Sequence, residues 1–385
     1  MNKTLVCSAI LALVSSGQSW ANSETEALKK LIEAQQQQLE ILKKRLDDQE
    51  QKIDVTADAV EDKTSQAHSD TTIGGYGELH YTNQGNKDTL DFHRFVLFFG
   101  HRFNDRLRLF SELEVEHSVA KDGGKGEVEV EQAYIEYDLN QTMSVRAGSL
   151  LVPVGILNET HEPITFYGVE RNLVEKDIIP TTWFEGGVGL TYRPAPGWTL
   201  DSAITGGLNV QTTGGNAYKI RNGRTQVASA KAENFAFTGR VKYTAIPGLE
   251  LAASLQYQDD VTQGNDKVSA TLFSTHGIYQ KGPFAVRALY ARWDLKSDAA
   301  KLMGRDIQEG YYVEPSYKLN EKLGLFARYS EWNNESGLSS SQWSKQTSYG
   351  LNYWLDAHVV LKMDWDSYAG ALDGDGFNLG MGYQF

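Results

Sequence analysis

Residues 106–116 read Arg-Leu-Arg-Leu-Phe-Ser-Glu-Leu-Glu-Val-Glu. Apolar and charged residues alternate along this stretch. In an extended strand, successive side chains point to opposite faces, so one face would be apolar and the other charged. The apolar face would carry Leu107, Leu109, Leu113 and Val115, and the charged face Arg106, Arg108, Glu112, Glu114 and Glu116. The stretch therefore predicts a β-strand between an apolar and a polar environment.

The same period of two continues from residue 73 to the end of the chain. Residues 235–243 and 357–366 alternate in this way, and residues 377–385 are apolar at every second place and end on Phe385. Sixteen segments of this kind can be counted: 73–82, 91–102, 106–118, 128–139, 142–150, 184–193, 197–207, 235–245, 249–258, 267–279, 283–294, 309–318, 323–332, 345–356, 358–367 and 376–385. Strands of outer-membrane barrels alternate in this manner and are even in number. We therefore predict an all-β transmembrane barrel of about 16 antiparallel strands over residues 71–385, with 14 or 18 strands as alternatives.

The lengths of the connections alternate as well. Short polar turns follow the even-numbered segments, and the long polar links 119–127, 208–234, 295–308 and 333–344 follow odd-numbered ones. In outer-membrane barrels the turns on the periplasmic side are short and the extracellular loops are long. The alternation thus predicts which end of the barrel faces the cell exterior.

A soluble β-sandwich is the competing architecture. Its inner faces would be dry and rich in Val, Ile and Leu, whereas here nearly every segment has one face with charged residues. Tyr and Trp also recur near segment ends, as in the two aromatic girdles of membrane barrels: Tyr81, Tyr137, Tyr192, Trp198, Tyr243, Tyr257, Tyr353 and Trp365. These features favour the membrane barrel.

The N-terminal 70 residues have a different pattern. Residues 1–21 have a basic start, a short apolar stretch that includes the only cysteine, Cys7, and small residues before position 22, as expected of a signal peptide. In residues 22–70, Ile32, Leu39, Leu46, Ile53 and Val60 recur every seven residues. This spacing predicts an oligomeric α-helical coiled coil, placed in the periplasm. A single amphipathic helix packed on the barrel remains an alternative.

Composition narrows the function classes. The formal net charge of −13 argues against nucleic-acid binding, which requires a basic surface. No Gly-x-Ser-x-Gly or His-Glu-x-x-His motif occurs, so no enzyme is predicted. The eight dispersed histidines and the lack of cysteine in residues 22–385 predict neither a cofactor nor a metal site.

One connection is exceptional. Residues 151–183 form a link of over thirty residues that is partly apolar. Because sixteen strands enclose an aqueous channel, we expect this loop to fold inward and narrow the channel, with Glu159, His161, Glu162, Glu170, Arg171 and Lys176 as constriction residues. Strand parity sends a set of basic side chains toward the lumen, since a lipid-facing Arg costs about 2–4 kcal/mol near the bilayer centre: Arg94, Arg108, Arg146, Arg240, Lys242, Arg287 and Arg328. The alternative is that each of these side chains pairs with a neighbouring carboxylate.

Four segments carry a resemblance to a known family: Gly75–Tyr81, Phe92–Phe95, Gly148–Asn158 and the terminal Gly-Tyr-Gln-Phe385. They resemble the phosphate-selective porins of O and P type, including relatives with an N-terminal coiled coil. The resemblance implies a homotrimeric channel of sixteen strands in the Gram-negative outer membrane. It also implies that the third extracellular loop forms the constriction and that inward Arg and Lys guide anions.

Residues 71–385 hold 29 basic and 38 acidic side chains, so phosphate, carboxylates and mixed small solutes all remain candidate solutes. We expect passive diffusion of small hydrophilic solutes through a barrel set in lipid. The alternative is a structural anchor that uses the coiled coil as a tether and transports little.

Overall fold

The computed structural model describes residues 70–85 and 87–385. The predicted signal peptide and, apart from Asp70, the predicted coiled coil lie outside these residues. The strands are β1 Thr71–Gln84, β2 Lys87–Asn104, β3 Leu107–Glu116, β4 Val128–Asn140, β5 Met143–Leu151, β6 Phe184–Tyr192, β7 Trp198–Thr205, β8 Ala236–Tyr243, β9 Leu249–Gln258, β10 Ser269–Lys281, β11 Phe284–Lys296, β12 Ile307–Lys318, β13 Leu323–Asn333, β14 Ser344–Asp356, β15 Val359–Gly370 and β16 Gly376–Gln384. The predicted count of sixteen is confirmed.

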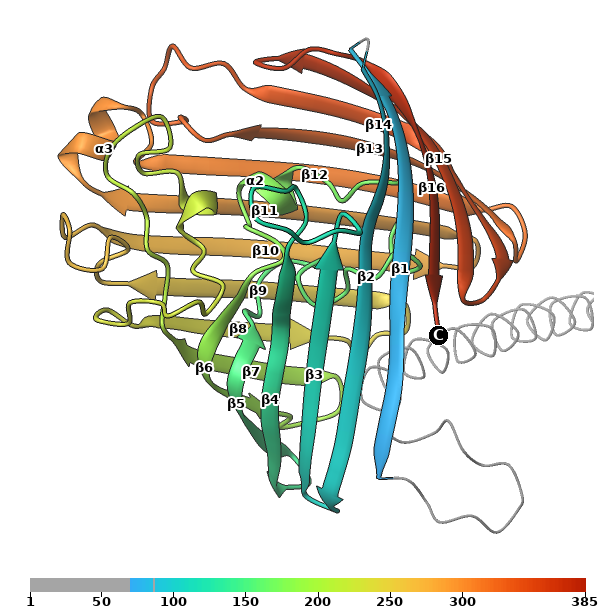
Figure 1. Ribbon diagram of the computed structural model, residues 1–385, viewed down its shortest axis with the longest axis horizontal. Coiled ribbons are helices and arrows are strands. Elements are labelled where there is room, and N and C mark those ends of the chain that lie inside the picture. The colour runs from blue at the N-terminus through green and yellow to red at the C-terminus, as the bar shows by residue number, and fades with distance from the viewer. Residues whose placement is uncertain (1–69, 86) are drawn as a thin grey trace, which may run out of the picture.

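Each strand pairs antiparallel with its neighbours in sequence, and β1 pairs with β16 to close the barrel (Figure 1). At the closure, the Gly75 N–H donates to the Phe385 carbonyl and the Phe385 N–H to the Gly75 carbonyl, both at 2.9 Å. The C-terminal residue thus takes part in the seam, and the described wall has no free sheet edge.

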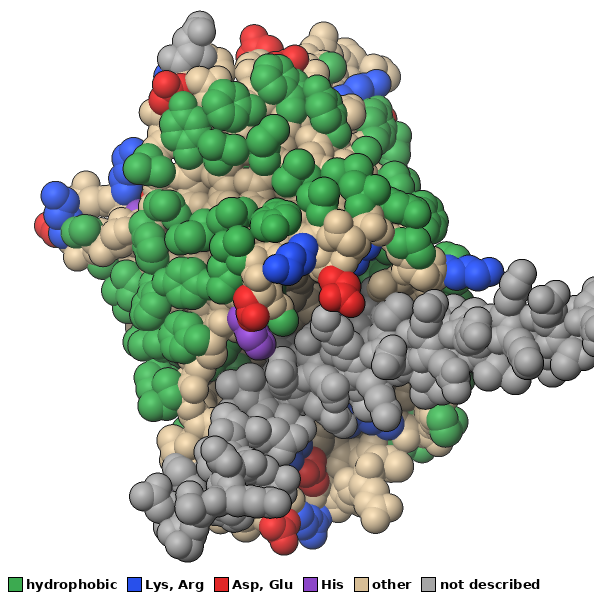
Figure 2. Space-filling view, turned by 90° about the vertical axis from the view of Figure 1, so that its right-hand side faces the viewer, with side chains coloured by type: hydrophobic (Ala, Val, Ile, Leu, Met, Phe, Trp, Pro, Cys, Tyr) green, Lys and Arg blue, Asp and Glu red, His purple; other side chains and the backbone are tan. Residues whose placement is uncertain are grey.

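The strands bury polar residues and expose apolar ones. In β8, Phe237 is 54% exposed while Arg240 is 7% exposed. In β15, Leu361, Met363 and Trp365 are exposed and Lys362, Asp364 and Asp366 are buried. Hydrophobic side chains cover much of the barrel face in Figure 2. This arrangement matches a barrel whose outer surface contacts lipid and whose interior is polar.

The main boundary difference lies at the hairpin between the first two strands. The sequence predicts a strand from residue 91, but β2 begins at Lys87. Residues 87–90 pair with residues 81–84 of β1, so the backbone ladder extends past the alternating pattern. Residues 87–90 lack the alternation of apolar and polar residues that predicts a strand, because both faces of this extension are polar or exposed.

The predicted long connections after β3, β5, β7, β11 and β13 are present, and short turns follow the even-numbered strands. β1 and β15 depart from the alternation, because only residues 85–86 link β1 to β2 and only residues 371–375 link β15 to β16. The loops contain the short helices α2 (Val174–Asp177), η1 (Ile220–Gly223) and α3 (Asp298–Leu302). Within the described residues, no helix is both long and apolar enough to pass through a bilayer.

The main apolar core lies inside the barrel, at its loops. It combines residues of segment 152–183, such as Trp183, with residues of segment 206–235, such as Ile220, and with wall residues Trp293 and Trp332. All four side chains are at most 2% exposed. Burying such large side chains stabilises a fixed arrangement of the loops.

Candidate functional site

Segment 152–183, called here the inserted loop, lies within the ring of strands, where Figure 1 places α2. Wall side chains donate hydrogen bonds to its backbone carbonyls around the barrel. These bonds are Arg94 to His161 (2.9 Å), Ser254 to Pro153 (2.9 Å), Arg287 to Thr165 (2.8 Å), Trp293 to Ile178 (3.0 Å) and Asn352 to Phe166 (3.0 Å). Since the donors belong to four strands spread around the barrel, β2, β9, β11 and β14, the inserted loop crosses the lumen.

Glu175 holds the inserted loop together. Its Oε2 accepts hydrogen bonds from the backbone N–H groups of Ile156 and Leu157, both at 2.7 Å. Its Oε1 accepts one from the Tyr312 hydroxyl on β12 at 2.8 Å. Glu175 is fully buried, so this carboxylate stabilises the loop rather than contacting solutes.

His161 and Glu162, two of the predicted constriction residues, are buried as well. The His161 Nε2 atom lies 3.5 Å from a Glu112 oxygen and 3.4 Å from a Glu131 oxygen. Burial alone would lower the pKa of His161, but the carboxylates of Glu112 and Glu131 raise it above its usual value. The positively charged His161 side chain therefore fixes the inserted loop to Glu112 of β3 and Glu131 of β4.

Glu159 and Glu170, which are partly exposed, each face a basic partner on the wall. Glu159 pairs with Arg240, and Glu170 accepts a hydrogen bond from His80 at 2.8 Å. Burial would raise the pKa of Glu159, but the charges of Arg240, Lys242 and Arg146 hold it well below its usual range. Glu159 is thus a carboxylate that offsets positive charge on the wall.

Four of the seven predicted wall cations form ion pairs. Arg94 pairs with Glu78, Arg108 with Asp138 and Glu136, Arg240 with Asp201 and Glu159, and Arg328 with Glu314. Arg146 lies over the Tyr134 ring, and Arg287 donates to a loop carbonyl. Among described residues, Lys242 forms no ion pair. Four of the wall cations thus have the geometry of the alternative stated above, in which each basic side chain pairs with a neighbouring carboxylate.

Three arginine side chains meet at Thr181–Thr182, near the end of the inserted loop. Arg171 donates to the Thr182 hydroxyl at 2.9 Å, Arg224 to the Thr182 carbonyl at 2.6 Å and Arg221 to the Thr181 carbonyl at 3.4 Å. Within the described part of the chain, none of the three forms an ion pair with a carboxylate. We call Arg171, Arg221 and Arg224 the arginine cluster.

The charges of the arginine cluster affect one another. Partial burial, together with the neighbouring Arg224, lowers the pKa of Arg221 to about 10. Partial burial and the proximity of Arg171 also lower the pKa of Arg224, although Glu129 opposes this shift. Arg221 and Arg224 remain positively charged at neutral pH. An anion bound within the cluster would relieve the repulsion between its guanidinium groups.

The sequence predicts Arg171 as a constriction residue but misses Arg221 and Arg224. These two lie on the loop between β7 and β8, which packs against the inserted loop in the apolar core. A signal was available, because residues 208–234 contain four basic side chains and one acidic side chain in a chain of net charge −13. The inward orientation of Arg221 and Arg224 could not be predicted from the sequence, because it depends on how the two loops pack.

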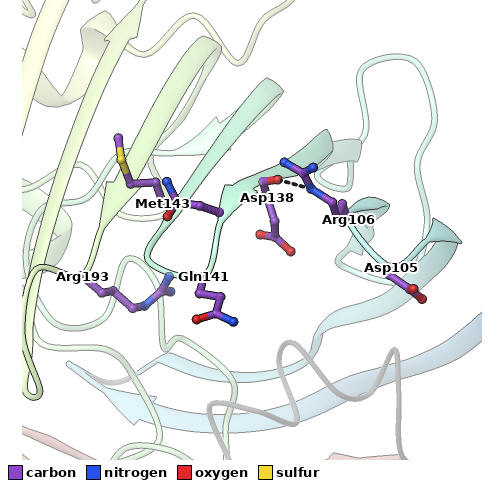
Figure 3. A pocket seen from close by; sticks show the side chains of 7 residues that line it. Asp105, Arg106, Asp138, Gln141, Met143 and Arg193 are labelled. Carbon is purple, nitrogen blue, oxygen red and sulfur yellow. Dashed lines mark hydrogen bonds between the residues drawn. The ribbon is translucent and has the colours of Figure 1, made fainter.

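A separate hollow of about 340 Å³ lies among the short turns, lined by Asp105, Arg106, Asp138, Asn140, Gln141, Met143 and Arg193. Figure 3 shows Arg106 bonded to the Asp138 carbonyl, at 2.8 Å. The hollow is at the end of the barrel opposite to the loops that form the arginine cluster, so we do not assign it to solute passage.

A closed sixteen-stranded barrel with an apolar exterior and a loop folded into its lumen defines the porin class of outer-membrane channels. The sequence profile of the family "phosphate-selective porin O and P" matches residues 70–365. The chain belongs to this family and is an outer-membrane channel for small solutes.

Several known proteins are similar to this chain. An uncharacterized protein of Aquifex aeolicus (strain VF5) is 30% identical over 370 residues, which cover 84% of this chain and 82% of that protein. Among solved structures, OmpT of Vibrio cholerae is 12% identical with a TM-score of 0.57, and the match covers 84% of this chain and 100% of that one. An anion-selective porin from Comamonas acidovorans is also 12% identical, with a TM-score of 0.57 and coverage of 82% and 99%. At such identities these structures show the shared barrel fold.

Proposed function

We propose that the inserted loop narrows this channel and that the arginine cluster makes it prefer small anions. The observation that carries the proposal is the presence of three guanidinium groups with no carboxylate ion-pair partner among the described residues. The paired wall arginines have their charge offset locally. The cluster therefore adds positive charge beside the inserted loop without forming an ion pair with a described carboxylate, as Arg287 and Lys242 do on the wall, despite the acidic composition of the chain.

Guanidinium groups bind both carboxylates and phosphates in a planar, two-pronged geometry. The cluster thus suits small oxyanions as a class. The anion-selective description of the Comamonas acidovorans porin agrees with this proposal. One of the similar structures is described as the trimer form of OmpT, and we propose a homotrimer here, with residues 22–70 as a periplasmic coiled coil.

Liposome swelling tests the proposal. Liposomes that contain the purified porin are diluted into isotonic solutions of a neutral sugar or of the sugar acid of the same size. We expect the acid to enter faster than the sugar, and we expect the triple variant Arg171→Gln/Arg221→Gln/Arg224→Gln to lose this preference while still admitting the sugar.

Arg106→Gln is the matched control for the loss of an arginine, because Arg106 lies at the short-turn end. It should leave both rates unchanged. Equal entry of acid and sugar in the wild type would contradict the anion preference. No swelling with either solute would favour the alternative function, a structural anchor.

A further inference from the structure

Three histidines that are far apart in the sequence come together on the inner wall. His80 lies on β1, His93 on β2 and His117 directly after β3. The His80 and His93 rings are stacked with centroids 4.6 Å apart, and the His93 and His117 rings meet edge-on at 5.7 Å. Asp91 lies beside them on β2. The channel function described above requires none of these contacts.

The local backbone directs His93 into this group. In the pairing of β1 with β2, Leu79 faces Phe92 and Glu78 faces Arg94, so His93 is an extra, bulged residue. A β-bulge re-aims a side chain and is common next to functional sites. The backbone N–H of His117 donates to the His93 carbonyl at 3.0 Å, which fixes the two imidazoles relative to each other.

The ligand atoms of Asp91, His93 and His117 have the spacing of a metal site. All lie within 4.8 Å of one another. The Nδ1 atom of His93 is 3.3 Å from an Asp91 oxygen, and the Nδ1 atom of His117 is 2.8 Å from the same oxygen. Zinc bonds of about 2.0–2.1 Å in a tetrahedron place neighbouring ligand atoms roughly 3.3 Å apart, so small shifts would complete the site.

We propose that Asp91, His93 and His117 bind a divalent transition-metal ion of the zinc type inside the lumen. Two imidazole nitrogens with one carboxylate oxygen suit such ions, whereas Mg²⁺ and Ca²⁺ prefer oxygen ligands alone. The three side chains are 31%, 18% and 31% exposed. An ion can therefore reach them from the channel, and a fourth position stays open to water or to a solute.

The surroundings of the site favour a cation. Glu78, Asp91 and Glu170 bring three carboxylates, of which Glu78 pairs with Arg94 and Glu170 with His80. Among the basic side chains that the structure describes, Asp91 contacts only the two histidines of the proposed site. His80, held between Glu170 at 2.8 Å and Glu78 at 3.2 Å, supports the ring of His93 by stacking. Such outer contacts orient metal ligands and strengthen binding. A bound ion would place two further positive charges on the inner wall.

Isothermal titration of ZnCl₂ into the full-length porin, purified without a polyhistidine tag and stripped with EDTA, tests the site. We expect one saturable zinc site per chain in the wild type and no comparable binding of MgCl₂. His93→Ala and His117→Ala should each weaken zinc binding by about 10-fold or more, in line with the effect of losing even an outer-shell partner. His358→Ala, which removes an exposed histidine at a short turn, should bind like the wild type.

Each variant is first shown to be folded by the shift in electrophoretic mobility that a barrel undergoes on heating. Zinc binding that is unchanged in both His93→Ala and His117→Ala would overturn the proposal, as would wild-type protein that binds no zinc. A loss on His80→Ala with none on His117→Ala would overturn this ligand set in favour of His80, His93 and Glu170, which also converge. The readout is binding, so it is independent of whether the channel prefers anions.

Discussion

Glu175 is a single buried residue that holds the inserted loop together and ties it to the wall. Its carboxylate accepts hydrogen bonds from two backbone N–H groups of the inserted loop and from Tyr312 of the wall. We expect Glu175→Ala to lower the free energy of unfolding by about 1–3 kcal/mol, because buried donors lose their partner. Urea unfolding of the porin in lipid bilayers measures this, with the exposed-turn variant Glu321→Ala as the control. A loss of equal size in both variants would contradict the role of Glu175.

The contribution of His161 to the free energy of unfolding should depend on pH. Its pKa in the folded protein is raised by Glu112 and Glu131, so its contribution to stability is full below the unfolded pKa of about 6.5. This contribution is lost as the pH rises through the higher, folded pKa.

The difference in unfolding free energy between wild type and His161→Gln should therefore be largest near pH 6 and should shrink in alkaline solution. Urea unfolding at several pH values measures the difference. His358→Gln, at an exposed turn, should show no such trend. A difference that grows with pH would contradict the ion pairs.

At the scale of the element, the outer face of β15 tests the contact with lipid. Met363 is 51% exposed and lies in the middle of this strand. We expect Met363→Arg to lower the free energy of unfolding in bilayers by about 2–4 kcal/mol, because the charge would enter the hydrocarbon region. Met363→Leu should leave the stability unchanged. If arginine were tolerated like leucine, this face of β15 would not contact lipid.

The strands could be predicted because their information is local. A period of two fixes which side of β3 or β15 faces lipid, and turn residues limit each segment. The arrangement of the inserted loop could not be predicted in the same way, since its contacts join residues such as Val169 and Asp364 that are 195 positions apart. The sequence identified Arg171 because it lies on the inserted loop itself. Its neighbours Arg221 and Arg224 were missed because they lie on a different loop and reach Arg171 only through long-range packing.

On the inner wall, the sequence predicts which side chains point inward but not which partners they contact. Parity correctly separates polar from apolar faces, as at Arg240 and Phe237. It says nothing about partners across strands, such as the pair of Arg94 with Glu78. The bulge at His93 also breaks the parity on which the prediction relies, which is why the gathering of histidines had no signal in the sequence.

For the whole molecule, we predict that residues 22–70 stabilise the oligomer. Leu39→Asp/Leu46→Asp would place charges at two apolar heptad positions and should dissociate the full-length oligomer more readily. Gln37→Asp/Lys44→Asp changes the outer face of the same heptads and should not. Chemical cross-linking followed by denaturing electrophoresis distinguishes the two, and equal oligomer yields for both variants would contradict a coiled-coil role.

We propose that this acidic porin prefers anions because three arginines beside its inserted loop form no ion pair with a carboxylate of the described residues. The most direct test is the reversal potential of single channels in a planar bilayer under a tenfold KCl gradient. We predict a potential of the sign given by chloride preference in the wild type and in Arg106→Gln. In Arg171→Gln/Arg221→Gln/Arg224→Gln it should fall towards zero or change sign. Cation preference in the wild type, or a chloride preference that the triple variant keeps in full, would contradict the claim.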